Sequence, residues 1–357
     1  MDDRTKAELR GPVSSCRTDV TMFIRGCRPD GCDLEPQERN HWTCTRYHRD
    51  GRTTEIQYHY PGGRESTSSF TYDEAGRLLE MDTRDAAGAI SKSIYSYDGS
   101  GRPLRVVVRT ADGTERTVRS FSYDDQHKTK TEYLPSSPGE GGLDVMYSME
   151  GSDAAVPAPG ATSMTTVYDG QGRPVETVFH DSQQRALCWL KLGYDEAGRM
   201  TEETLYAASE ETLPAEMLAQ LNPAQLQSVK AIFGLGEGRQ QWKRVHRYDA
   251  EGRRVETAFH FGALGGERRT TAYNDHGDLS EEKTYRNARE LSIDDQGRIA
   301  GGENLTTNEA PSYEARSSYQ YDEHGNWIER VVSGRSQPDQ PFVECSLERR
   351  SLTYHPA

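Results

Sequence analysis

Apolar and polar residues alternate along much of this chain with the period of two that is typical of half-buried β-strands. Phe70 and Tyr72 flank a threonine, and Val255, Thr257 and Phe259 stand at every second position of another run. Residues that favour tight turns, above all Gly and Asp, separate these runs. The pattern predicts strands of about seven residues that are joined by tight turns, which are antiparallel β-hairpins.

One turn phrase, Tyr-Asp-x-x-Gly-Arg, recurs along the chain. The tyrosine ends a strand, the aspartate side chain can accept hydrogen bonds from amides of the turn, and the glycine supplies a positive φ. We therefore expect these residues to hold the fold as a structural turn motif. The five complete copies are Tyr72, Asp73, Gly76, Arg77; Tyr97, Asp98, Gly101, Arg102; Tyr168, Asp169, Gly172, Arg173; Tyr194, Asp195, Gly198, Arg199; and Tyr248, Asp249, Gly252, Arg253.

Relaxed copies of the phrase extend the repeat. They begin at Tyr47, Tyr123, Tyr273, Ile293 and Tyr321. Tyr47, Tyr72 and Tyr97 are 25 positions apart, a period that is characteristic of repeat arrays. The chain therefore predicts consecutive copies of one hairpin unit.

At this spacing the phrase resembles the RHS or YD-repeat family, whose large members wind β-hairpins into a hollow shell. An opening Leu9-Arg-Gly-Pro-Val13 and a closing segment from Tyr321 to Glu329, followed by Arg350 to Tyr354, resemble its small bacterial, toxin-less branch. The resemblance implies an all-β scaffold of tandem antiparallel hairpins that form an elongated curled sheet or partly closed shell. It implies no particular activity.

We expect one continuous YD-repeat β array over residues 1–357, with three special regions. Residues 1–46 form a cysteine-containing N-terminal cap, and the Pro/Gly-rich residues 134–162 form a flexible loop insertion. Residues 209–236 form a small helical insertion, because apolar residues there follow a helical period between Pro214 and Gly234. The helix lies over the sheet, plugs a shell or docks a partner.

Composition narrows the function classes. The chain is only 33% hydrophobic, which suits an exposed scaffold, and its formal net charge of −14 argues against binding to nucleic acid. No stretch approaches the length of a membrane span, and the first residues lack the apolar run of a signal peptide. We expect a cytoplasmic protein or, if an export signal has been trimmed, a secreted or cell-surface protein.

Cysteines crowd the N-terminal region at Cys16, Cys27, Cys32 and Cys44. Disulfides, unpaired thiols and a zinc site are all compatible with these positions, although Cys27 and Cys32 lack the close pairing of common zinc sites. We expect no bound metal and no cofactor.

The sequence contains no recognisable catalytic or phosphate-binding motif. We therefore expect a non-enzymatic repeat scaffold that binds an unknown protein or glycan at the cell surface or in secreted material. Two alternatives are a shell that encloses a cargo segment and a glycoside hydrolase-like enzyme with an unidentified carboxylate pair.

Overall fold

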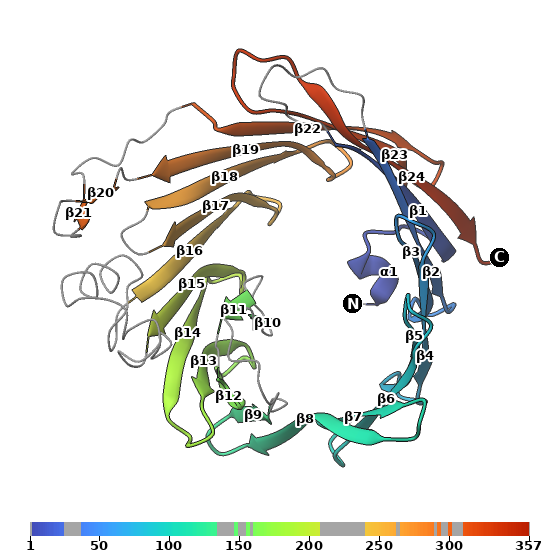
Figure 1. Cartoon of the computed structure of the whole chain (residues 1–357), viewed down its shortest axis with the longest axis vertical. Coiled ribbons are helices and arrows are strands. Elements are labelled where there is room, and N and C mark those ends of the chain that lie inside the picture. Colours follow the sequence, from blue (N-terminus) through green and yellow to red (C-terminus); the bar gives the residue numbers. More distant parts are fainter. Residues whose placement is uncertain are drawn as a thin grey trace. The chain divides into compact units, whose positions relative to one another are not determined.

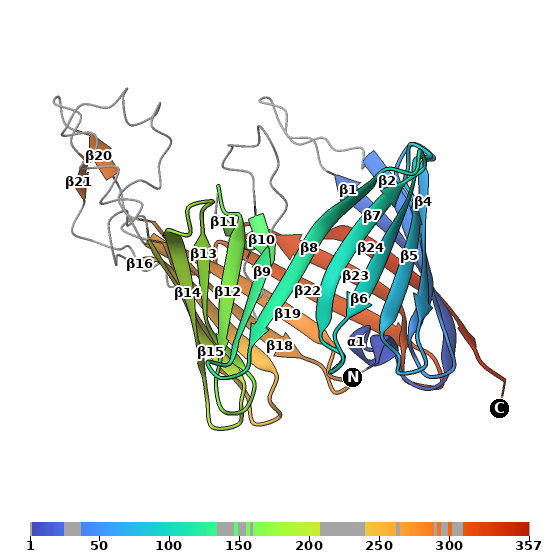
Figure 2. The same cartoon turned by 90° about the horizontal axis from the view of Figure 1, so that it is seen from below.

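A computed structural model describes residues 2–24, 37–133, 146–148, 155–157, 160–207, 240–261, 265–288, 291–293, 299–301 and 310–356. Its strands pair as successive antiparallel hairpins (Figure 1; Figure 2). The all-β class and the tandem hairpins predicted from the sequence are confirmed. Within these described residues the one helix is α1, Asp3–Lys6, which the sequence analysis missed. Its single turn starts at Asp2, whose side chain accepts a hydrogen bond from the amide of Thr5.

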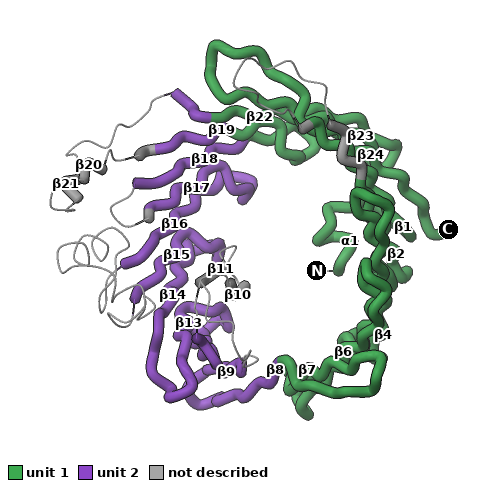
Figure 3. The backbone as a smooth tube through the Cα atoms, viewed as in Figure 1, with its two compact units in different colours: residues 1–118, 272–282, 313–357 green, residues 119–271, 283–312 purple. Residues whose placement is uncertain are grey.

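The chain forms two compact units (Figure 3). Unit 1 contains residues 1–118, 272–282 and 313–357, and unit 2 contains residues 119–271 and 283–312. The boundaries fall within three strands, which are β8 (Glu115–Asp124), β18 (Gly265–Tyr273) and β19 (Leu279–Ala288).

Ten strands of unit 1 pair in an unbroken antiparallel series. In order of pairing they are β22 (Tyr313–Tyr321), β23 (Trp327–Arg335), β24 (Val343–Tyr354), β1 (Val13–Ile24), β2 (Gln37–Tyr47), β3 (Thr53–His59), β4 (Glu65–Tyr72), β5 (Leu78–Arg84), β6 (Ile90–Tyr97) and β7 (Pro103–Thr110). The first strand of the chain thus lies between the last strand and the second, as Figure 1 shows.

The strands of unit 2 form a second antiparallel series. β9 (Thr129–Tyr133) pairs with β12 (Ser163–Tyr168), and from β12 onward neighbours in the chain are neighbours in the sheet. The strands that follow β12 are β13 (Pro174–His180), β14 (Ala186–Tyr194), β15 (Met200–Ala207), β16 (Gln240–Tyr248), β17 (Arg254–Phe261) and β18. Two further hairpins are short: β10 (Met146–Ser148) pairs with β11 (Ala155–Pro157), and β20 (Leu291–Ile293) pairs with β21 (Ile299–Gly301).

Each unit has its own apolar cluster. In unit 2 the fully buried Phe179, Leu190 and Leu205 lie on one face of β13, β14 and β15, with Trp242 of β16 beside them. In unit 1 a smaller cluster joins Leu9, Val13, Cys16 and Tyr47 to the partly buried Leu352 and Tyr354. Residues from both ends of the chain therefore share one core.

Several predicted features lie outside the described residues. These include the whole of the helical insertion at 209–236 and most of the Pro/Gly-rich insertion at 134–162, of which β10, β11 and residues 160–162 are described. In the N-terminal region, residues 13–24 and 37–47 are strands of the unit 1 sheet.

Candidate functional site

The repeated turn is built from its own aspartate, glycine and arginine. In the turn between β4 and β5, the carboxylate of Asp73 accepts hydrogen bonds from the backbone amide of Arg77 at 2.8 Å and from its Nε at 2.6 Å. Gly76 has a φ of 82°, which a residue with a Cβ rarely adopts. The same two Asp–Arg bonds and the same positive φ recur in the other four complete turns, at Asp98, Asp169, Asp195 and Asp249.

These hydrogen bonds lower the pKa of the motif aspartates. In four turns the hydrogen bond from the backbone amide of the arginine is the largest cause that holds the aspartate pKa below its ordinary value. These residues are Asp73, Asp98, Asp169 and Asp195. Their carboxylates are therefore ionised acceptors that are occupied by the turn.

The motif tyrosine connects each hairpin to the preceding one. A register shift directly before the tyrosine marks a β-bulge in the complete motifs, for example between Thr71 and Tyr72. The hydroxyl of Tyr72 then donates to the carbonyl of Thr53 at 2.8 Å, one residue past the motif arginine of the preceding turn. Equivalent bonds run from Tyr97 to Leu78, from Tyr194 to Pro174 and from Tyr248 to Met200.

The motif arginine makes a second link between neighbouring turns. The guanidinium of Arg77 lies over the ring of Tyr97, at 5.0 Å from the ring centroid, in a cation–π contact. The other pairs are Arg52 with Tyr72, Arg173 with Tyr194 and Arg199 with Tyr248, at 4.6 to 5.1 Å. The motif side chains thus contact one another from turn to turn.

The last two turns of unit 1 depart from this pattern. In turn 273–278 and turn 321–326 the final arginine is replaced by Asp278 and Asn326, and a histidine precedes the glycine. His276 stacks on the ring of Tyr321 at 3.8 Å, and His324 lies 4.3 Å from the ring of Tyr354. Here histidine occupies the place over the tyrosine ring that arginine has elsewhere.

The tyrosine hydroxyls at these turns bind side chains instead of carbonyl groups. Tyr321 donates to Asp278 Oδ2 at 2.7 Å, and Tyr354 donates to Asp322. Burial, together with the adjacent carboxylate, raises the pKa of both Tyr321 and Tyr354 to about 12. Both phenols are therefore neutral donors at ordinary pH.

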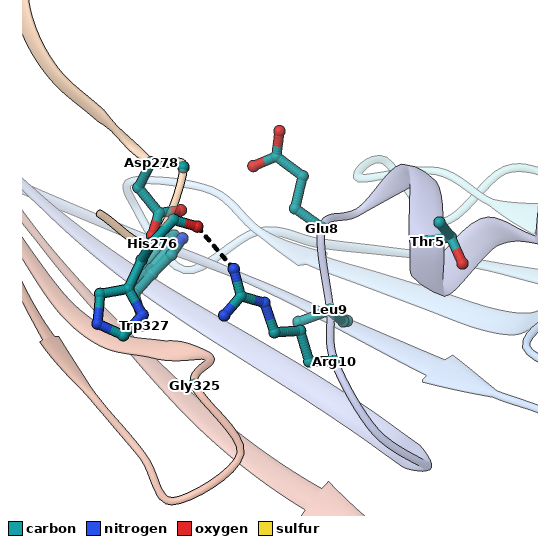
Figure 4. Close-up of a pocket in the computed structure, with 9 residues that line it drawn as sticks. Thr5, Glu8, Leu9, Arg10, His276, Asp278, Gly325 and Trp327 are labelled. Carbon is teal, nitrogen blue, oxygen red and sulfur yellow. Dashed lines mark hydrogen bonds between the residues drawn. The ribbon is translucent and has the colours of Figure 1, made fainter. Parts of the chain in front are cut away.

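A pocket of about 300 Å³ lies at these two variant turns (Figure 4). The N-terminal segment forms one side of it, and turn 273–278 forms the other. The guanidinium of Arg10 points toward His276 and donates to its carbonyl at 2.6 Å (Figure 4). The lining residues are Thr5, Glu8, Leu9, Arg10, His276, Gly277, Asp278, Gly325 and Trp327. No sequence pattern marks this pocket, because Arg10 and His276 are separated by 266 positions in the chain.

Local backbone geometry places Arg10 in the pocket. Glu8, directly after the α1 turn, has a φ of 58°, a left-handed conformation that commonly ends helices and that usually falls on glycine. The reversal directs Leu9 into the apolar cluster of unit 1. Arg10 follows it and reaches the two variant turns.

Unit 2 contains a second polar cluster, around His246. Its Nε2 lies 3.0 Å from Glu203 Oε1, and its Nδ1 lies 3.1 Å from Thr257 Oγ1. Carboxylate, imidazole and hydroxyl are thus in a row, as in a nucleophilic triad. The side chains of Glu203 and His246 have no exposed surface, so a substrate has no access to them. We interpret this cluster as a satisfied polar network within the sheet.

The predictions for the cysteines concern disulfides, unpaired thiols and a zinc site. Cys16 faces Thr45 across the β1–β2 pair whereas Cys44 faces Arg17, so the two thiols point to opposite faces of the sheet. Cys16, Cys44, Cys188 and Cys345 are free thiols, and Cys27 and Cys32 lie outside the described residues. In the described part of the chain no three His, Cys, Asp or Glu side chains meet as metal ligands would.

Tandem hairpins that share one turn and one set of turn-to-turn contacts define the class, a β-hairpin repeat protein. A family model for the RHS repeat matches residues 47–90, which contain the turns at Tyr47 and Tyr72. Over these residues the resemblance to the RHS-repeat family seen in the sequence is confirmed. A search of curated proteins finds no match.

Solved structures with a similar chain path include a porin-like protein from Bacteroides uniformis, at 10% identity and a TM-score of 0.32, over 96% of this chain and 99% of that chain. A TcdB2–TccC3–Cdc42 complex is similar at 11% identity and a TM-score of 0.22, over 91% of this chain and 19% of that chain. The Tc holotoxin pore of Photorhabdus luminescens is similar at 12% identity and a TM-score of 0.23, over 92% of this chain and 18% of that chain. This chain spans less than a fifth of either toxin chain. Among the described residues, no helix is long and apolar enough to span a membrane.

Proposed function

We propose that this protein is a non-enzymatic repeat scaffold that binds a protein or glycan partner, at the cell surface or in secreted material. The observation that carries the proposal is the use of the motif side chains. The Asp, Arg and Tyr side chains that recur most often bond to one another and to the backbone of neighbouring turns. Recognition therefore falls to the strand faces, whose residues vary from repeat to repeat.

Exposed aromatic residues near the β3–β4 turn are the best candidates for partner contact. Tyr58 and Tyr60 are 39% and 40% exposed, and their rings stack at 6.4 Å. The hydroxyl of Tyr60 lies 3.3 Å from that of Ser66. Flat rings beside hydroxyl groups suit both the apolar face of a sugar and the side chains of a peptide.

The test is binding by a Tyr58→Ala/Tyr60→Ala variant. Retention on a panel of immobilised glycans, and capture of proteins from an extract of the native organism, are compared with wild type. Tyr133→Ala is the matched control, because Tyr133 is also exposed, at 45%, but lies on β9. We expect the double variant to lose the interaction that the control retains. Equal binding by all three proteins would contradict the proposed surface.

A second candidate function is a shell around a cargo segment. It is favoured by the complete burial of Phe179, Leu190 and Leu205 on one face of the unit 2 sheet. The candidate cargo is the helical insertion predicted at 209–236. In a variant with a Gly-Ser linker in place of residues 213–236, stronger binding of a dye that detects apolar surface would support this function. Unchanged dye binding would count against it.

A further inference from the structure

In four of the five complete turns, all but the one at Gly172, the glycine packs against an arginine of the neighbouring turn. A Cβ placed on Gly101 would lie 3.0 Å from Arg77 NH1, and one placed on Gly76 would lie 3.1 Å from Arg52 NH1. The same neighbour is found at Gly198, where the arginine is Arg173. The guanidinium therefore fills the space that the missing side chain of the glycine leaves.

Gly325, in the last turn, also packs against an arginine, although the neighbouring turn has none at the motif position. Because β19 pairs with β22, the neighbour of Gly325 in the sheet is turn 273–278, which ends in Asp278 and has no arginine at that position. A Cβ on Gly325 would nevertheless lie 2.9 Å from a guanidinium NH1, with the Cδ and Cζ of the same side chain at 3.8 and 3.9 Å. The corresponding distances from Gly101 to Arg77 are 3.0, 3.8 and 4.0 Å. The arginine at Gly325 is Arg10, from the N-terminal segment.

We propose that turns 273–278 and 321–326 form a guanidinium-binding socket, and that Arg10 is its built-in ligand. The carbonyl of His276 accepts from one end of the guanidinium at 2.6 Å, while Gly325 leaves room for the other (Figure 4). His276 already covers the ring of Tyr321, so the socket takes a guanidinium by hydrogen bonding and packing. The N-terminal segment thus supplies the group that Asp278 lacks.

The backbone of the segment is held independently of the guanidinium. Asn326, which is only 2% exposed, accepts from the amide of Arg10 at 2.6 Å and donates to its carbonyl at 3.0 Å. Both bonds use main-chain atoms, so they survive replacement of the Arg10 side chain. Arg10→Ala therefore empties the socket while the chain path past it is retained.

A second arginine of the same segment meets the first turn of the array. A Cβ on Gly51 would lie 2.5 Å from Asp2 Cγ and 2.9 Å from Arg4 Nε, and Arg4 NH2 donates to the carbonyl of Arg49 at 3.0 Å. The segment from Arg4 to Arg10 therefore contacts turn 47–52 and turn 321–326 of unit 1. This arrangement explains why an N-terminal Leu-Arg-Gly phrase accompanies a final turn whose neighbour lacks arginine.

The socket is tested in the full-length protein by hydrogen exchange and chemical rescue. Arg10→Ala should make amides of residues 9–16 exchange about tenfold faster, because local opening becomes easier when a charged hydrogen bond is lost. Millimolar ethylguanidinium should restore their protection, since it fits the vacated space. Ethylammonium, which has the charge but not the planar fork of donors, should not restore it. Unchanged exchange in Arg10→Ala, or equal rescue by both cations, would overturn the socket.

A second variant keeps the proposal testable if Arg10→Ala does not fold. Arg10→Lys keeps the positive charge and the main-chain bonds to Asn326 but lacks the planar fork of donors, so it should fold while residues 9–16 still exchange faster than in wild type. Wild-type protection of residues 9–16 in Arg10→Lys would contradict the proposal. Arg316→Ala is the control, because Arg316 makes an exposed ion pair with Glu281 at 3.3 Å in the same unit and should leave residues 9–16 unchanged.

Discussion

The hairpins of β3 to β7 in unit 1 and of β12 to β17 in unit 2 share one turn but differ in burial. Within β3 to β7 the buried residues are Thr53, Ser93 and Val106, and none is fully inaccessible. In unit 2, Phe179, Leu190 and Leu205 have no exposed surface. A repeat motif that fixes the turn therefore leaves the burial of the strands free to vary.

The difference originates in the cross-strand pairs. In unit 1, Ser68 faces Thr83, and their hydroxyl groups lie 3.2 Å apart. In unit 2, Leu190 faces Leu205, which in turn faces Trp242. Hydroxyl pairs are stable on a solvated sheet face, whereas aliphatic and indole side chains gain free energy only when water is excluded. Strand composition, not the motif, thus decides which unit has an extended apolar core.

The largest expected effect is at Phe179. Phe179→Ala should lower the free energy of unfolding by about 3–5 kcal/mol, because it removes a fully buried ring and leaves a cavity. Phe70→Ala, on the partly exposed β4, should cost clearly less. Urea unfolding of both variants measures the two values. Equal losses would show that the two regions do not differ in core packing.

Replacing a turn glycine with alanine should destabilise the protein less than Phe179→Ala does, and by almost the same amount in both units. Gly101 and Gly172 have φ values of 81° and 78°, so alanine at either position should cost about 1–2 kcal/mol of backbone strain. A Cβ at Gly101 also approaches Arg77 NH1, whereas a Cβ at Gly172 meets nothing within 4 Å. Thermal melting should therefore rank Gly101→Ala as the less stable variant. The reverse order would contradict the packing of arginine against glycine.

Acid should weaken turns of both units. The pKa values of Asp98 and Asp195 are lowered in the folded state, so the stability they contribute is present above the unfolded-state pKa and is lost as pH falls through the folded-state value. Melting temperature should therefore fall below about pH 4, where aspartate in the unfolded chain takes up its proton. Asp98→Asn and Asp195→Asn should each reduce this decline. A decline as steep as that of wild type would argue against the turn carboxylates as its source.

Treatment with the chelator EDTA should have the smallest effect on stability. If the N-terminal thiols hold no structural zinc, EDTA should leave the melting temperature unchanged, because removing such a metal removes folding free energy directly. A marked loss of stability that zinc reverses would show a site that includes Cys27 or Cys32.

Local features of the fold could be predicted from the sequence. The aspartate, glycine and arginine of the complete turns interact over four positions, so a short phrase contains the information. Arg10 could not be placed in this way, because its partner Asn326 is 316 positions distant and the relevant signal at Asp278 is the absence of an arginine. The burial of Glu203 and His246 also escaped prediction, since the pairing of β15 with β16 is needed to bring them together.

The pairing of β1 with β24 has a mechanical consequence. Val13 pairs with Tyr354, so the outer ends of the first and last strands lie at the same end of an antiparallel ladder. A force that pulls the two chain ends apart would load the hydrogen bonds of this ladder one after another, as in a zipper, instead of shearing them together. Arg10 and Asn326 lie at the end that is loaded first. Tension on the chain would thus meet first the contacts of Arg4 with turn 47–52 and next those of Arg10 with Asn326, before the β1–β24 ladder opens.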